Sequence, residues 1–161
     1  MAQPIIGIMG PGDSATSSDL KNANELGHLI AQHDWYLLTG GRNTGVMDAA
    51  SKGASKAGGT VIGILPSTDK TEASEYLDIP ICTGMGSARN NINVLSSDVI
   101  IALGTGAGTT SEIMLALKAD KPIVLLTPAD SLLSFVDALP YSRPAIAQSP
   151  EEVISLIKQY L

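Results

Sequence analysis

The fold class follows from Val99-Ile100-Ile101-Ala102-Leu103-Gly104-Thr105-Gly106-Ala107-Gly108-Thr109-Thr110-Ser111-Glu112. The apolar run at its start is typical of a buried strand, and the glycines that follow are typical of a tight turn. The threonines predict the start of a helix, whose first N–H groups lack partners within the helix. The segment therefore predicts a phosphate or sulfate at the turn. Glu112 is expected in the first helical turn, close to that anion.

Strand-like and helix-like segments alternate along the rest of the chain. Strands are expected at 4–9, 35–39, 60–65, 79–82, 98–103 and 122–127. Helices are expected at 19–32 with Ser17 or Ser18 as cap, at 46–57, 87–96, 131–139 and 150–160, and from the threonines to Ala119. This alternation predicts a single α/β domain over residues 1–161, a doubly wound, Rossmann-like parallel sheet with helices on both faces.

Composition narrows the class of protein further. The chain is 44% hydrophobic but only 4% aromatic, so its core is built from aliphatic side chains, as in parallel sheets. A net charge of -6 argues against nucleic acid as a partner, because binding to phosphate backbones depends on Lys and Arg. No apolar run approaches the ~20 residues that cross a bilayer, and no basic region precedes the first strand. A cytoplasmic protein without a membrane segment is expected.

Four glycine turns, at Gly10, Gly40, Gly84 and Gly104, each follow a predicted strand. The carboxyl ends of parallel strands meet at one edge of a sheet, where ligands bind, so one shared site is expected. Arg89 is the most informative residue beside these turns, because an Arg at a helix start opposes the helix dipole unless it binds an anion. A surface salt bridge is the alternative explanation for it.

Other chemistries find little support in the sequence. The glycine spacing matches neither the dinucleotide fingerprint nor the P-loop, which argues against NAD or ATP. His28 and His33 lack partners at metal-ligand spacing and are expected at the surface, so no metal site is predicted. The single Cys82 has no accompanying His and is expected to be a small buried residue.

Four spaced motifs carry a family resemblance. They are Gly40-Gly41-Arg42-Asn43-Thr44-Gly45-Val46-Met47, Gly58-Gly59-Thr60-Val61-Ile62-Gly63-Ile64-Leu65-Pro66, Arg89-Asn90 and Gly104 to Glu112. Together they resemble the LOG family, some members of which cleave nucleoside monophosphates to a free base and ribose phosphate. In that family the residues matching Arg89 and Glu112 serve substrate binding and hydrolysis of the N-glycosidic bond.

Departures from that pattern point to a second group with the same fold. Gly104-Thr105-Gly106 stands where the hydrolases carry Pro-Gly-Gly, and Asn90 replaces their usual Lys. The segments 7–12, 35–42 and 86–93 more closely resemble the molybdenum cofactor carrier proteins of algae and cyanobacteria. Those proteins are oligomers that hold and protect the cofactor, a pterin with one phosphate and a dithiolene that already ligates molybdenum. Such cargo needs a phosphate cradle but no Cys ligand.

Two hypotheses follow. The first is a non-catalytic carrier of molybdenum cofactor (Mo-molybdopterin), which forms a dimer or tetramer and exchanges cargo with molybdoenzymes or cofactor-synthesis proteins. The alternative is a phosphoribohydrolase that uses Arg89 and Glu112. Under the first, the cofactor-binding residues are Gly10, Gly12, Gly40, Gly41, Arg42, Asn43, Ser87, Arg89, Asn90, Gly106, Ala107, Gly108, Thr109 and Thr110.

Overall fold

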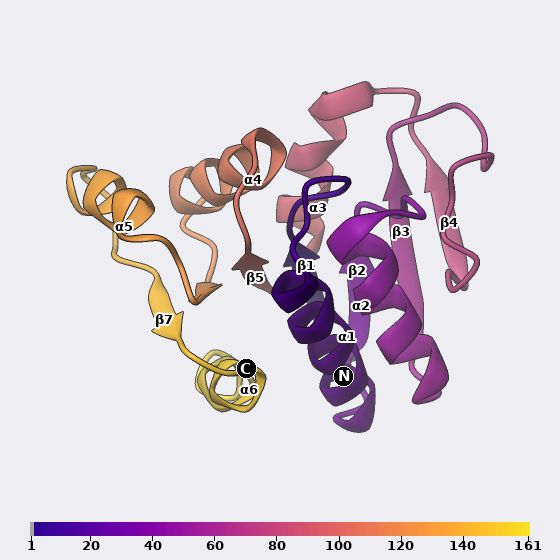
Figure 1. Cartoon of the computed structure of the whole chain (residues 1–161), viewed down its shortest axis with the longest axis horizontal. Coiled ribbons are helices and arrows are strands. Elements are labelled where there is room, and N and C mark those ends of the chain that lie inside the picture. The colour runs from indigo at the N-terminus through magenta and orange to yellow at the C-terminus, as the bar shows by residue number, and fades with distance from the viewer. Residues whose placement is uncertain (1) are drawn as a thin grey trace.

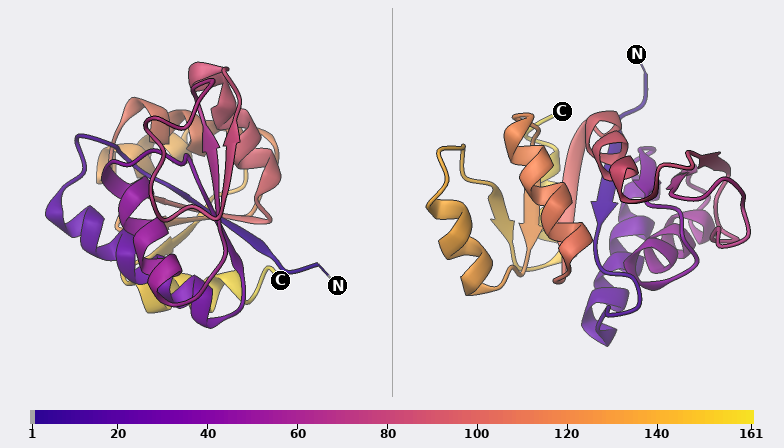
Figure 2. Two further views of the ribbon diagram at one scale, coloured as in Figure 1. Left: turned by 90° about the vertical axis from the view of Figure 1, so that its right-hand side faces the viewer. Right: turned by 90° about the horizontal axis from the view of Figure 1, so that it is seen from above.

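The computed structural model describes residues 2–161 and contains a twisted seven-stranded sheet with helices on both faces (Figures 1 and 2). The strands are β1 (Ile5–Met9), β2 (Tyr36–Thr39), β3 (Val61–Leu65), β4 (Ile79–Cys82), β5 (Val99–Leu103), β6 (Ile123–Leu126) and β7 (Ala145–Ala147). The helices are α1 (Ser17–Gln32), α2 (Gly45–Lys56), the 3-10 helix η1 (Gly86–Arg89), α3 (Asn90–Ser96), α4 (Ala107–Lys118), α5 (Asp130–Asp137) and α6 (Pro150–Ile157). Every neighbouring pair of strands is parallel, which confirms the predicted fold class.

The order of the strands fixes where a ligand would bind. Across the sheet they run β4-β3-β2-β1-β5-β6-β7. The chain therefore moves outward from β1 to β4 and then returns to the other side of β1 with β5. This reversal is the switch point of a doubly wound sheet, where ligands bind beside the turns that follow the strands. The pairing of Met9 with Ala102 brings the ends of these two strands to the same level.

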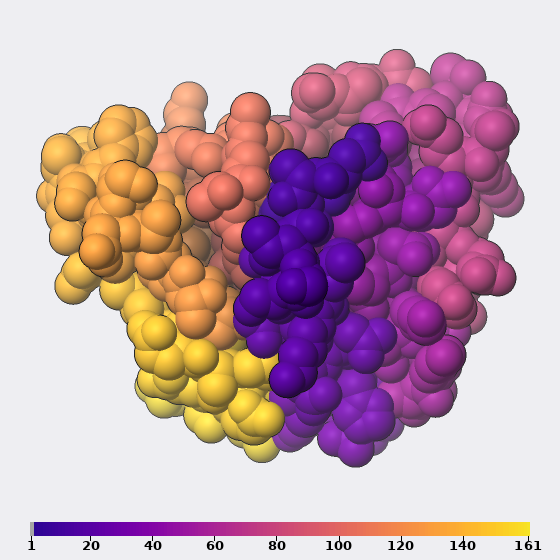
Figure 3. All heavy atoms as spheres, in the orientation of Figure 1, coloured from indigo at the N-terminus to yellow at the C-terminus, as the bar shows by residue number. Residues whose placement is uncertain are grey.

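Two apolar layers hold the helices against the sheet. One lies between the strands and α1, α2 and α6, which form a continuous surface on the face shown in Figure 3. The other lies between the strands and α3, α4 and α5. Helices α1 and α2 approach so closely that a Cβ on Gly27 would lie 2.1 Å from the carbonyl oxygen of Ala50. The small residues of α2 therefore pack against α1 of the same chain.

Most predicted elements are present, with shifted ends. The cap of α1 is Thr16 rather than Ser17 or Ser18: its hydroxyl accepts from the Asp19 N–H, and the Asp19 carboxylate accepts from the Thr16 N–H. The sequence did not predict β7, because three residues are too few to show a period. Cys82 was expected to be buried but is exposed, since β4 is an edge strand. In residues 2–161 no helix has the length and apolar character needed to cross a membrane.

Candidate anion-binding site

A cavity of about 240 Å³ opens at the switch point, at the carboxyl ends of β1, β2 and β5. The sequence-predicted residues that line it are Gly10, Gly12, Gly40, Arg42, Arg89, Asn90, Gly106, Ala107, Gly108, Thr109 and Glu112. Four other predicted residues, Gly41, Asn43, Ser87 and Thr110, do not line it. The turn at Gly84 is also outside the cavity, because it follows the edge strand β4. Three of the four glycine turns therefore meet at one site.

The first turn of α4 supplies unpaired hydrogen-bond donors. Within residues 2–161 the backbone N–H groups of Ala107, Gly108 and Thr109 have no acceptor, and the first bonded N–H is that of Thr110, which donates to the Gly106 carbonyl at 2.9 Å. The buried Thr109 hydroxyl also has no hydrogen-bond partner among the described residues. A Cβ on Gly108 would meet nothing within 4 Å, so space remains beside these donors. The arrangement suits an anion at the positive end of the helix dipole.

Glu112 lies on the same face of α4 as Thr109, three residues further on. The prediction that it belongs to the first turn is wrong, because α4 begins at Ala107 rather than at the threonines. Its side chain is buried, and its Oε1 accepts a hydrogen bond from Nδ2 of Asn93 on α3 at 2.9 Å. Burial raises the pKa of Glu112 from 4.5 to about 7, although the Asn93 hydrogen bond and Arg89 act in the opposite direction. Glu112 is therefore largely protonated below neutral pH.

Arg89, at the last position of η1, is buried without a partner in the part of the chain that the structure describes. Only 8% of the surface of Arg89 is exposed. Within residues 2–161 its Nε has no hydrogen bond, and no carboxylate lies within 4.0 Å of its guanidinium. A surface salt bridge therefore does not explain it. Burial lowers the pKa of Arg89, Glu112 raises it, and Arg42 lowers it further. An unpaired buried cation of this kind calls for an anion, because its desolvation is otherwise uncompensated.

Gly40 makes room for this guanidinium. A Cβ at this position would lie 2.3 Å from Nη1 of Arg89 and 2.7 Å from Sδ of Met47. A side chain at this position would therefore force the end of the Arg89 guanidinium or the Met47 sulfur to move. Only the tertiary arrangement could reveal this, since Gly40 and Arg89 lie far apart in the sequence.

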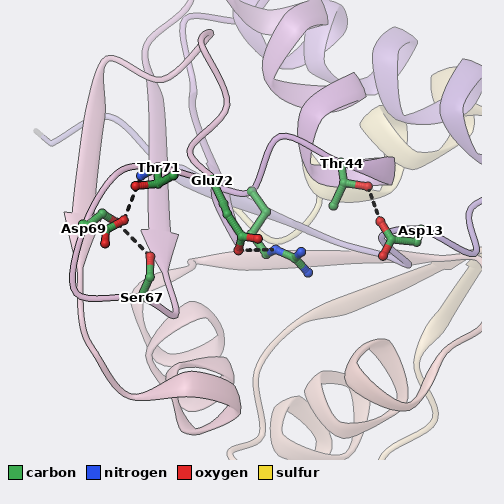
Figure 4. Close-up of polar contacts among 7 residues, drawn as sticks. Asp13, Thr44, Ser67, Asp69, Thr71 and Glu72 are labelled. Carbon is green, nitrogen blue, oxygen red and sulfur yellow. Dashed lines mark hydrogen bonds and ion pairs between the residues drawn. The ribbon is translucent and has the colours of Figure 1, made fainter.

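Arg42 is held by the loop 67–76, which connects β3 to β4. Nε of Arg42 lies 3.5 Å from Oε2 of Glu72 in an ion pair (Figure 4). The backbone N–H of Asn43 donates to the Glu72 carbonyl, and the N–H of Ser74 donates to the Gly41 carbonyl, both at 2.9 Å. The loop is therefore bonded to the turn after β2. This explains why Gly41 and Asn43 are not in the cavity wall.

Sequence reasoning missed five further lining residues, which are Ile8, Met9, Pro11, Ser14 and Met47. Ile8 and Met9 end β1, and Pro11 packs on the turn after β5, where a Cβ on Gly104 would lie 2.7 Å from the Pro11 ring. Pro11 follows Gly10 directly, so its position in that turn was the available signal. Met47 ends the motif Gly40 to Met47, whereas nothing in the local sequence distinguishes Ser14.

Comparison with known proteins adds to this geometry. Residues 3–154 match the SLOG cluster4 family. The chain belongs to this family. It is similar to the molybdenum cofactor binding protein of the phototrophic bacterium Rippkaea orientalis, with 57% identity, a TM-score of 0.96, and coverage of 99% of this chain and 98% of that one.

Two other proteins extend the comparison for this SLOG cluster4 member. It is 50% identical to the molybdenum cofactor carrier protein of Chlamydomonas reinhardtii, with a TM-score of 0.92 and coverage of 99% of this chain and 98% of that one. It is also 44% identical over 99 residues to an uncharacterized protein of Archaeoglobus fulgidus, a match that spans 62% of this chain and 64% of that protein. The resemblance to carrier proteins found in the sequence motifs thus extends over nearly the whole chain.

Proposed function

We propose that this protein binds and protects molybdenum cofactor as a non-catalytic carrier. The observation that carries the proposal is the unpaired, buried guanidinium of Arg89 beside the free N–H groups of α4, in a chain whose net charge is -6. Binding an anionic cargo would compensate the buried charge and satisfy these donors. The two similar proteins whose names include the cofactor, from Rippkaea orientalis and Chlamydomonas reinhardtii, support the same cargo.

The donor set fits this cofactor. Its phosphate suits the N–H groups of Ala107 to Thr109, and its other anionic atoms suit Arg89 and Arg42. Asn90 supplies an amide at the cavity wall, which suits polar atoms of the pterin. No cysteine is needed, because the dithiolene of the cofactor already ligates the metal, and in residues 2–161 none lines the cavity. Proteins that make or use the cofactor are the expected partners in exchange.

The direct test is to incubate the purified protein with cofactor released from a molybdoenzyme and, separately, with AMP. Retention of pterin through gel filtration is expected in the first sample, and no adenine is expected in the second. Steady release of adenine, abolished by Glu112→Ala, would instead identify a phosphoribohydrolase. A general acid commonly contributes ~10²-fold or more to such a rate, so the loss would be large.

The phosphate position has its own test. A crystal grown in sulfate or phosphate should show the anion on the N–H groups of Ala107, Gly108 and Thr109. Exchange of Gly108 for Ala places a methyl group in the open space beside them and should weaken that binding without clashing with the protein. An empty turn at high sulfate would count against the cradle.

We also propose that the protein is a homo-oligomer, joined through α3 and α4. The segments 46–57 and 112–119 are rich in small and apolar residues. The small residues of α2 pack against α1. An apolar groove on the outer side of α3 and α4, by contrast, contains the partly exposed Met114 and Leu115. Asn90 lines both this groove and the cavity, so a second copy seated there would adjoin the cargo. A monomer mass in sedimentation at micromolar concentration would refute this.

A further inference from the structure

The two oxygen atoms of Glu112 have different surroundings. Oε1 accepts the hydrogen bond from Nδ2 of Asn93, across the contact between α3 and α4. Oε2 receives no hydrogen bond from residues 2–161 and is not among the fully covered polar atoms that lack a partner. Since Glu112 lines the cavity, Oε2 is the oxygen that a ligand can reach. One oxygen of Glu112 is thus held by the protein, and the other remains open to a ligand.

The charged neighbours of Glu112 are few. Arg89, from η1, acts on the pKa of Glu112, whereas Arg42, from the turn after β2, acts on that of Arg89. Within residues 2–161, neither β1, β5, α1 nor α2 adds a titratable side chain to the cavity wall. Arg89 lies more than 4.0 Å from the carboxyl group, so among residues 2–161 no ion pair holds Glu112 in its ionised form.

An ionised Glu112 would conflict with an anionic cargo, whereas a neutral one would help to bind it. A carboxylate in this cavity places a negative charge beside the anion and offers no hydrogen to its acceptor atoms. The acid form removes that charge and adds one donor to those of Arg89 and α4. It also leaves both arginines free to balance the charge of the cargo.

We propose that Glu112 holds the cargo as a neutral carboxylic acid, donating a hydrogen bond from Oε2 to an acceptor atom of the cofactor, and that loss of this proton weakens retention. This inference rests on the proposed carrier function. It makes Glu112 a binding residue of the carrier in place of the catalytic role that the LOG resemblance implies. It also ties release of the cargo to a rise in pH, because the proton leaves to solvent as the carboxyl group ionises.

The test compares wild-type protein with Glu112→Gln, which keeps the shape and the donor but cannot ionise. Affinity for released cofactor is measured at pH 6 and pH 8.5 at constant ionic strength, through the fluorescence of the retained pterin after oxidation. With a pKa of about 7, affinity of the wild type should fall by up to about 30-fold more than that of Glu112→Gln between these values. The cofactor's own phosphate titrates equally in both measurements, and the comparison removes its effect.

Two further readouts separate the possible outcomes. The infrared band of a protonated carboxyl group should be present at pH 6 in the wild type and reduced in Glu112→Gln. In Asn93→Ala, which removes the donor to Oε1, weakening should begin at a higher pH, because that hydrogen bond favours the ionised form. Parallel pH profiles for the wild type and Glu112→Gln would overturn the role of Glu112 but not the carrier function. Failure of the wild type to retain cofactor at any pH would overturn the carrier function itself.

Discussion

Replacing Glu112 by Gln should change the stability of the cargo-free protein in a pH-dependent way. The pKa of this carboxyl group rises from 4.5 in the unfolded chain to about 7 in the folded protein. The folded state therefore binds the proton more tightly, and the wild type loses stability as the pH rises from about 4.5 to about 7. One pKa unit corresponds to about 1.4 kcal/mol, so the loss amounts to about 3 kcal/mol. Gln carries no such penalty.

The assay is urea unfolding of wild type and Glu112→Gln at pH 4.5 and pH 8. The difference in unfolding free energy between the two proteins should shift by about 3 kcal/mol in favour of Glu112→Gln between these values. Comparing the two proteins at each pH cancels the titration of all other groups. Glu25→Gln, on the exposed side of α1, serves as the control, and its difference from wild type should stay nearly constant. A difference for Glu112→Gln that is equal at both pH values would refute the reasoning.

Three other substitutions have expected outcomes. Arg89→Ala should lower cofactor affinity about tenfold to a hundredfold, since it removes a charge-assisted contact of roughly 1.5 to 3 kcal/mol; equilibrium dialysis showing wild-type affinity would contradict this. Gly40→Ala places a carbon 2.3 Å from Nη1 of Arg89 and should lower cofactor affinity as much as Arg89→Ala does, because the guanidinium must move. A crystal structure of Gly40→Ala with the guanidinium in its original position would contradict this. Gly27→Ala should cost roughly 1 to 3 kcal/mol in urea unfolding, because its Cβ would lie 2.1 Å from the Ala50 carbonyl oxygen; a stabilised variant would rule that contact out.

The sheet and the position of the site were predictable because they depend on local patterns. Buried strands such as Val99–Leu103 are continuous apolar runs, and each is followed by glycines and a helical period. Parallel strands share an edge, so turns distant in the sequence were expected to meet. Three of them do. The fourth, at Gly84, follows the edge strand β4, and strand order depends on packing between distant segments that local periodicity does not encode.

The electrostatic state of the site depended on the folded arrangement. The sequence identified Arg89 and Glu112, but their burial results from η1, α3 and α4 packing around the switch point. Desolvation depends on every neighbour of a group, and these neighbours come from separate parts of the chain. Asn93, which holds Glu112, and Gly40, which makes room for Arg89, acquire those roles only through contacts made on folding. Local sequence predicted hydrogen-bond donors at the turn after Val99–Leu103, whereas tertiary packing determined the burial and the charged neighbours of Arg89 and Glu112.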